Sequence, residues 1–119
     1  MAAMKVIDKE AFLDTFQYFD KPIVLEIIDI FIQEQPERLE RISIAITNLD
    51  FDALKFDSHS LKGVIANFVA EKPLQLAKTM EMKGTEKDNS ELDLLFSELK
   101  SATCDLVDDL KSLRQEFEE

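Results

Sequence analysis

His59 is the one histidine of the chain, and it is the natural candidate for nucleophilic or acid–base chemistry at nitrogen near neutral pH. On a helix with about 100° per residue, it lies opposite an apolar stripe made by Leu54, Leu61, Ile65 and Phe68. The imidazole is therefore expected on a polar helix face rather than in the core. A lone histidine on such a face is most often an ordinary surface residue, so its neighbours decide whether it has a function.

The turn that follows His59 favours a functional interpretation. Gly63 interrupts a helix interior, where glycine costs about 1 kcal/mol relative to alanine, and it is one of only two glycines in the chain. Because Cα–Cβ bonds tilt toward the helix N-terminus, a side chain at position 63 would lean over the turn that carries His59. With glycine at this position no side chain covers the imidazole, and Ala66 adds only a methyl group on the next turn. The alternative interpretation is that Gly63 serves close helix–helix packing.

Lys62 and Lys55 add positive charge to the same polar face. A neutral imidazole can attack phosphorus without a separate base. The ammonium of Lys62 would disfavour the imidazolium form and attract phosphoryl oxygens, unless Lys62 is simply a solvated lysine. These residues indicate phosphoryl transfer on nitrogen. Lys55 and Lys62 also form a local positive patch for docking on an acidic protein partner, and Phe56 lies near the edge of the same face.

The composition excludes several other classes of protein. The chain has 119 residues, 45% of them hydrophobic, and a formal charge of −11, which disfavours nucleic acid and anionic lipid as partners. One cysteine and one histidine exclude an internal disulfide and a thiolate–imidazole zinc site, and Cys104 is expected to be a small, buried or half-buried residue. With neither a signal peptide nor a run of roughly 20 apolar residues, a single cytoplasmic domain over 1–119 is expected.

Only two glycines and three prolines leave little material for turns, which favours a few long helices. The capping residues Asp8 and Asp20 predict helices over 9–18 and 21–48. Pro36 lies inside the second of these helices and should kink it, because proline removes a backbone donor and crowds the preceding turn. Two helices broken just before Pro36 are the alternative.

Two further helices are predicted in the middle of the chain. One begins after Asp50 and continues through Phe68, with apolar residues at alternating spacings of three and four. The next begins near Pro73 and runs to about Lys83, with Gly84 as its C-terminal glycine.

Ser90 is the predicted cap of the last helix, whose charged first turn contains Asp93 and whose apolar stripe spans 92–117. That helix would have about 28 residues and a length of about 42 Å. The stripe is interpreted as the core face of one helix, with a coiled-coil seam for dimerisation as the alternative. The sequence thus predicts an all-α, up-down four-helix bundle with a short additional N-terminal helix.

The segment His59-Ser60-Leu61-Lys62-Gly63 resembles the His-x-Leu-Lys-Gly signature of histidine-containing phosphotransfer (HPt) domains of multistep phosphorelays. A second segment, Met80-Glu81-Met82-Lys83-Gly84, is similar to the Leu-Glu-x-x-Gly with which the following helix of that family tends to end. The chain departs from the family where a further glycine often follows the signature, since Val69 occupies that place.

The resemblance implies a phosphocarrier without ATP-dependent kinase activity of its own. His59 would accept and donate the phosphoryl group through Nε2, Lys62 would steady that group electrostatically, and Gly63 would give the partner clearance. The partner would be a receiver domain with a phospho-aspartate, or a hybrid sensor kinase, docked over the second and third helices. Mg²⁺ would belong to the receiver, and this chain would act as a monomer without metal or cofactor. The docking residues would be Lys55, Phe56 and Ala66.

Some alternatives stay open at this point. The residue that orients the imidazole through its other nitrogen is not assigned, with Lys55, Asp52 and residues of the second helix as candidates. A sensor-kinase dimerisation domain is disfavoured, because such domains usually carry an acidic residue directly after the histidine and Ser60 stands there. The remaining alternatives are a phosphoacceptor domain cut from a chemotaxis-type kinase and a helical adaptor or dimerisation module that is not phosphorylated.

Overall fold

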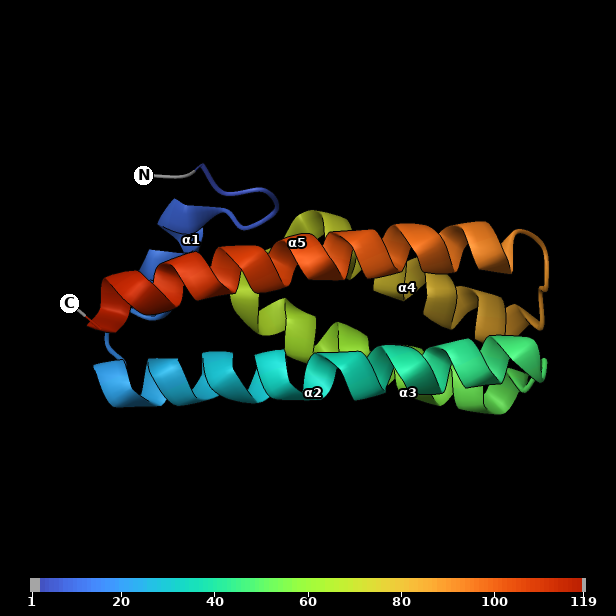
Figure 1. Cartoon of the computed structure of the whole chain (residues 1–119). Coiled ribbons are helices and arrows are strands. Elements are labelled where there is room, and N and C mark those ends of the chain that lie inside the picture. The colour runs from blue at the N-terminus through green and yellow to red at the C-terminus, as the bar shows by residue number, and fades with distance from the viewer. Residues whose placement is uncertain (1–2, 119) are drawn as a thin grey trace.

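The computed structural model describes residues 3–118, which form five α-helices, one short 3₁₀-helix and no strand. The elements are α1 (Lys9–Thr15), α2 (Lys21–Thr47), α3 (Phe51–Ile65), η1 (Ala66–Phe68), α4 (Glu71–Glu86) and α5 (Leu92–Glu118). Figure 1 shows α2 to α5 side by side, each running opposite to the helix before it, with α1 at the end where α5 finishes. The predicted all-α class is confirmed.

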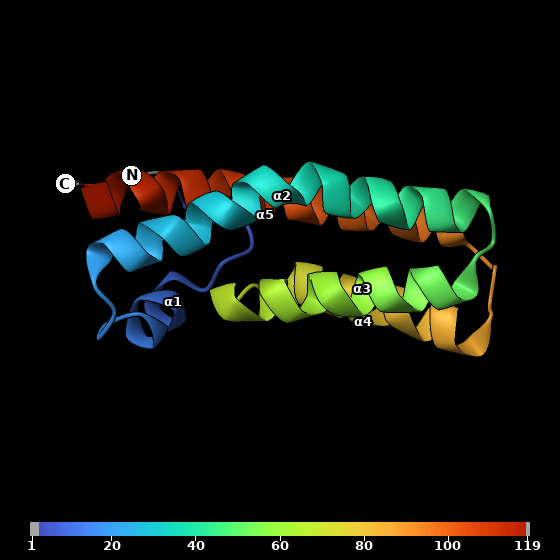
Figure 2. The same cartoon turned by 90° about the horizontal axis from the view of Figure 1, so that it is seen from below.

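The long helices pack around one core. α2 packs chiefly on α3 and α5, and α4 packs chiefly on the same two helices, so that α3 and α4 form one side of the molecule (Figure 2). The apolar stripe of α5 faces this core, because five of its leucines are buried: Leu92, Leu99, Leu106, Leu110 and Leu113. A seam buried inside its own chain cannot also join two copies, so the coiled-coil alternative loses its basis.

Three of the four predicted N-cap residues, Asp8, Asp20 and Asp50, directly precede helices, and two of them cap their helix with the side chain. The carboxylate of Asp8 accepts the N–H of Ala11, and that of Asp50 accepts the N–H of Ala53, both at 3.1 Å. Asp20 also directly precedes its helix, but its side chain makes no capping hydrogen bond.

α2 continues without interruption through Pro36. Figure 2 shows the helix bending near its middle, as expected where proline removes one backbone donor and crowds the preceding turn. The kinked helix is therefore the correct prediction, and the alternative of two separate helices is wrong.

Two predicted helix ends are wrong because the chain turns earlier. α1 stops at Thr15 rather than at residue 18, since Phe16 leaves helical geometry and buries its ring. α3 stops at Ile65 rather than at Phe68, and η1 follows it. Beyond η1, Val69 takes a left-handed conformation with φ of 54°, and its carbonyl accepts the N–H of Asp8 at 2.9 Å. A left-handed residue ends a helix, and here a side chain stands where glycine is the usual choice.

The two caps predicted around the loop between α4 and α5 are also wrong. α4 ends where Lys87 takes a left-handed conformation with φ of 53°, so Gly84 lies buried inside the helix. Glu91 rather than Ser90 directly precedes α5. The hydroxyl of Ser90 instead donates to Oδ1 of Asp88 at 2.6 Å, which makes it part of the loop.

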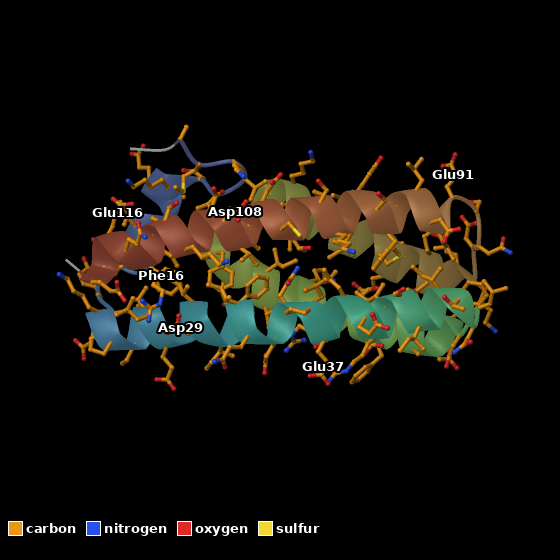
Figure 3. The ribbon with its side chains drawn as sticks, viewed as in Figure 1. Phe16, Asp29, Glu37, Glu91, Asp108 and Glu116 are labelled. Carbon is orange, nitrogen blue, oxygen red and sulfur yellow. The ribbon has the colours of Figure 1, made fainter. Side chains whose placement is uncertain are left out.

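The N-terminal segment is fastened to α5 by one buried carboxylate. Asp109 is 2% exposed and accepts the backbone N–H groups of Lys5, Val6 and Ile7 at distances from 2.8 to 3.0 Å. α1 follows, and Phe16, directly after its last residue, is buried; the view of Figure 3 labels it between the ribbons of α2 and α5. This segment closes the end of the molecule at which α5 finishes.

Cys104 is exposed on α5, so its expected burial is wrong. Its neighbour Thr103 is buried, and one further residue on a helix turns the side chain by about 100° toward the surface. Over residues 3–118, no helix combines the length and the apolar character that crossing a membrane requires.

Candidate functional site

The side chain of His59 is 68% exposed and lies midway along α3. On the same helix Leu54 is 1% exposed, and Leu61 and Ile65 are fully buried. The helix therefore buries one face and presents the imidazole on the other, as its periodicity predicts. The ring is open to a partner as large as another protein.

Glu81 of α4 binds the imidazole from the neighbouring helix. Its Oε2 lies 2.7 Å from Nδ1 of His59, within hydrogen-bond distance. An ionised carboxylate only accepts hydrogen bonds, so this contact assigns the proton to Nδ1. In the neutral ring Nε2 then holds the free lone pair. The nitrogen with the free lone pair is thus Nε2, on a largely exposed ring.

Lys62 completes a three-residue network around the same carboxylate. Its Nζ lies 2.6 Å from Oε1 of Glu81, so each oxygen of Glu81 holds one donor. The hydrogen bond from Lys62 is the largest cause that lowers the pKa of Glu81; burial opposes it, and the hydrogen bond from His59 adds to it. Glu81 is therefore ionised at neutral pH. Lys62 thus contacts the same carboxylate that holds the ring of His59.

Gly63 and Ala66 place no bulky side chain beside the histidine. Both are exposed, and a Cβ added at Gly63 would meet no atom within 4 Å. Close helix packing therefore does not explain this glycine. The open space around position 63 is compatible with clearance for a partner, and that role of Gly63 stays a prediction.

Lys55 and Phe56 border the histidine on its N-terminal side. Together with Asp52, His59 and Glu81 they line an open depression of about 440 Å³. Phe56 is 73% exposed, which is unusual for a large aromatic ring. The three predicted docking residues are all exposed: Lys55 and Phe56 on α3, which carries His59, and Ala66 directly after it at the start of η1.

A family model of the Hpt domain matches residues 26–118 of this chain. The chain belongs to the Hpt domain family. Hpt domains are phosphocarriers that act through histidine in two-component phosphorelays, and they are not kinases. The recognised segment contains α3, α4 and α5, and with them the whole His59–Glu81–Lys62 network.

The fold of this Hpt domain has a solved counterpart. The crystal structure of histidine-containing phosphotransfer protein B (HptB) from Pseudomonas aeruginosa PAO1 is similar with a TM-score of 0.86. The match covers 96% of this chain and 98% of that chain, at 19% sequence identity. At this identity the likeness shows a shared helical fold. A comparison with curated protein sequences gave no match.

On its other side, the histidine-bearing helix of the Hpt domain packs against α2. Nη1 of Arg38 donates to the hydroxyl of Ser60 at 2.7 Å, and Nη2 of Arg38 pairs with Glu34 at 3.2 Å. Further along the two helices lies a small, largely apolar depression of about 140 Å³. It is lined by Ile27, Ile30, Phe31, Glu34, Val64, Asn67 and Phe68.

Glu81 is the functional residue whose role the sequence prediction missed. The orienting group was expected from Lys55, Asp52 or the second helix, and it comes from α4 instead. A signal existed, since residues 80–84 resemble a family segment that contains this glutamate. Its contact with His59 depends on how α3 and α4 are aligned along each other, which helical periodicity does not specify.

Within residues 3–118, no group of three or more His, Cys, Asp or Glu side chains is arranged to hold a metal ion. The carboxylate nearest the imidazole, Glu81, already holds two protein donors. Its chemistry in this Hpt domain is that of a hydrogen-bond acceptor.

Proposed function

We propose that this protein is a phosphorelay intermediate. His59 accepts a phosphoryl group from a receiver-domain aspartate and passes it to the aspartate of another receiver. The observation that carries the proposal is the contact of 2.7 Å between Nδ1 of His59 and Glu81, on a side chain that is 68% exposed. It leaves Nε2 with a free lone pair where a second protein can reach it.

The transfer step can be written with its atoms balanced. The Nε2 lone pair attacks phosphorus, the new P–N bond forms, and the bond between phosphorus and the aspartate oxygen breaks. The aspartate carboxylate leaves with the electron pair, and the ring of His59 becomes positively charged while Nδ1 keeps its proton. The ionised Glu81 stabilises that charge at a distance of 2.7 Å. Transfer to the next receiver is the same step in reverse.

Lys62 supplies positive charge beside the incoming phosphoryl group. One of its three ammonium donors is used by Glu81 at 2.6 Å, so others are available for phosphoryl oxygens. Removing this charge would leave Glu81 as an uncompensated anion where another anion must arrive. Lys62 therefore serves both to neutralise Glu81 and to attract the phosphoryl group.

The docking surface in this proposal is centred on the exposed face of α3. Gly63 and Ala66 give clearance, while Lys55 and Phe56 offer a positive charge and an apolar ring. The local lysines permit contact with an acidic receiver although the chain as a whole carries a charge of −11. A hybrid sensor kinase that contains a receiver domain would dock in the same way.

Other properties belong to the same proposal. The Mg²⁺ needed for transfer would be held by the receiver, and this chain would contribute no cofactor and no ATP-dependent kinase activity. The protein would act as a monomeric single domain in the cytoplasm, with the architecture of an up-down four-helix bundle and a short additional N-terminal helix. The packing of α2 and α4 against both α3 and α5 supports that architecture.

A transfer assay tests the function directly. A receiver domain phosphorylated on aspartate is mixed with the protein in the presence of Mg²⁺, and the label is followed by gel. We expect an acid-labile, base-stable label on the wild type and none on His59→Gln, whose helicity should be unchanged because the side chain is 68% exposed. Label that persists on His59→Gln would contradict the proposal.

A further inference from the structure

α4 approaches the backbone of α3 closely at a glycine, Gly84. A Cβ built on Gly84 would lie 2.7 Å from the backbone nitrogen of Lys55, 2.9 Å from its Cα and 3.0 Å from its Cβ. The two nearest atoms belong to backbone, which cannot move aside as a flexible side chain can. Any residue other than glycine would therefore push α4 away from α3. Glycine occupies this position inside α4 although it is about 1 kcal/mol less favourable than alanine in a helix interior.

This contact lies directly beside the proposed phosphorylation site. Gly84 follows Glu81 by three residues and Lys55 precedes His59 by four, so each lies about one turn from its partner on the same helix face. α3 and α4 run in opposite directions (Figure 1), so the two contacts are successive steps of one interface. The separation of the helices at Gly84 is therefore transmitted to the carboxylate and the imidazole.

We infer that Gly84 is a positioning residue for His59: by letting α4 approach the backbone of Lys55, it brings Glu81 within reach of both Nδ1 of His59 and Nζ of Lys62. The inference rests on the proposed function of His59 and names a residue on which that function depends. It also explains why the glycine lies within α4 rather than at the end of the helix.

The distances set the size of the effect. Ordinary van der Waals contact begins at 3.4 Å, so a methyl group at position 84 requires a retreat of about 0.7 Å. The same retreat at the contact between Glu81 and His59 would lengthen 2.7 Å beyond the normal hydrogen-bond range of about 2.7–3.2 Å. Rotation of Glu81 cannot recover both partners, because one oxygen serves Lys62 at 2.6 Å while the other serves His59.

The test compares Gly84→Ala with Gly63→Ala, which makes the same chemical change where a Cβ meets nothing within 4 Å. The ¹⁵N signals of the His59 ring report which nitrogen carries the proton, and the receiver assay reports the transfer rate. We expect Gly84→Ala to shift the signals toward a mixture of both tautomers and to lower the rate about tenfold, as loss of an orienting partner does. Gly63→Ala should leave the ring signals unchanged.

A second pair of variants separates positioning from stability. Leu113→Ala removes a fully buried side chain of α5 and should lower the melting temperature without changing the ring signals. In a Glu81→Ala background, Gly84→Ala should have no further effect on the ring signals or the rate. All spectra are recorded in sucrose-containing buffer, which favours the compact state, so that folded proteins are compared.

Two results would overturn the inference. One is a Gly84→Ala protein that loses thermal stability but keeps the wild-type ring signals. The other is an equal loss of transfer from Gly84→Ala whether or not Glu81 is present. If no variant and no wild type accepted phosphoryl label, the proposed function would fail, while the ring signals would still show whether Gly84 positions Glu81.

Discussion

Oε2 of Glu81 lies 2.7 Å from Nδ1 of His59, across the interface between α4 and α3. The two residues are separated by 22 positions in the chain, and the contact turns a surface histidine into one with a defined tautomer. The same carboxylate holds Lys62 at 2.6 Å, so the charge of the acceptor is itself balanced. The imidazole, the carboxylate that orients it and the ammonium group are thus brought together by two adjacent helices without any loop.

Replacing Glu81 by glutamine should slow transfer without unfolding the protein. The amide keeps the size of the side chain but loses the negative charge that fixes the proton on Nδ1 and stabilises the phosphorylated ring. We expect a loss of about 10- to 100-fold in the receiver transfer rate, the usual cost of losing an orienting partner. Glu86→Gln, an exposed change on the same helix, is the matched control and should keep the wild-type rate. Equal rates for both variants would show that Glu81 has no part in transfer.

Replacing Gly63 by leucine should block the receiver and spare the fold. No atom lies within 4 Å of a Cβ at this position, so the new side chain extends into solvent over the turn that carries His59. Transfer from a phosphorylated receiver should become undetectable, while the melting temperature changes little, and Gly63→Ala should retain most of the rate. A large loss of stability together with normal transfer would instead indicate a packing role.

The helices and the exposed face of His59 could be predicted from the sequence because both follow from local periodicity. Leu54, Leu61 and Ile65 recur on one side of α3, and the histidine necessarily falls on the other. The partner of the imidazole could not be predicted in this way. Glu81 reaches His59 because the contact of Gly84 with Lys55 sets how closely α4 packs on α3. A tertiary contact of that kind produces no periodic pattern in the sequence.

Tertiary contacts of this kind also account for two of the wrongly predicted helix ends. A glycine followed by a charged loop is a normal sign of a helix C-terminus, yet Gly84 is used for close approach and Lys87 takes the left-handed position. Val69 is the converse case, since a β-branched residue stands in a left-handed conformation where the family often has glycine. Its carbonyl is held by the N–H of Asp8, a contact from the far end of the chain.

Replacing Ser58 by alanine should stabilise the protein. Its hydroxyl oxygen is fully buried and has no hydrogen-bond partner among the described residues, which costs free energy that alanine would not pay. We expect the free energy of unfolding to rise by about 1 kcal/mol, measured by urea denaturation with an unchanged slope. Ser60→Ala is the control, because that hydroxyl accepts from Arg38 at 2.7 Å and its loss should not stabilise. A destabilised Ser58→Ala protein would contradict the prediction.

The loop between α4 and α5 should make part of the stability sensitive to acid. Oδ1 of Asp88 accepts from the hydroxyl and the N–H of Ser90, and Oδ2 accepts from Lys83 at 3.0 Å. The hydroxyl of Ser90 is the largest cause that lowers the pKa of Asp88 to about 2, from an ordinary value of 3.8. The folded state therefore favours the ionised carboxylate. Its contribution to stability is complete above the ordinary pKa and is lost as the pH falls through about 2.

Urea denaturation over this acid range measures that contribution. Asp88→Asn should lose less free energy of unfolding than the wild type between about pH 4 and pH 2, because it has no carboxylate to protonate there. Ser90→Ala should fall between the two, since it removes the largest single cause of the lowered pKa and keeps Lys83. Asn89→Ala changes an exposed neighbour in the same loop and should follow the wild-type curve. Parallel curves for Asp88→Asn and the wild type would show that protonation of Asp88 does not contribute, and that other carboxylates account for the whole loss in acid.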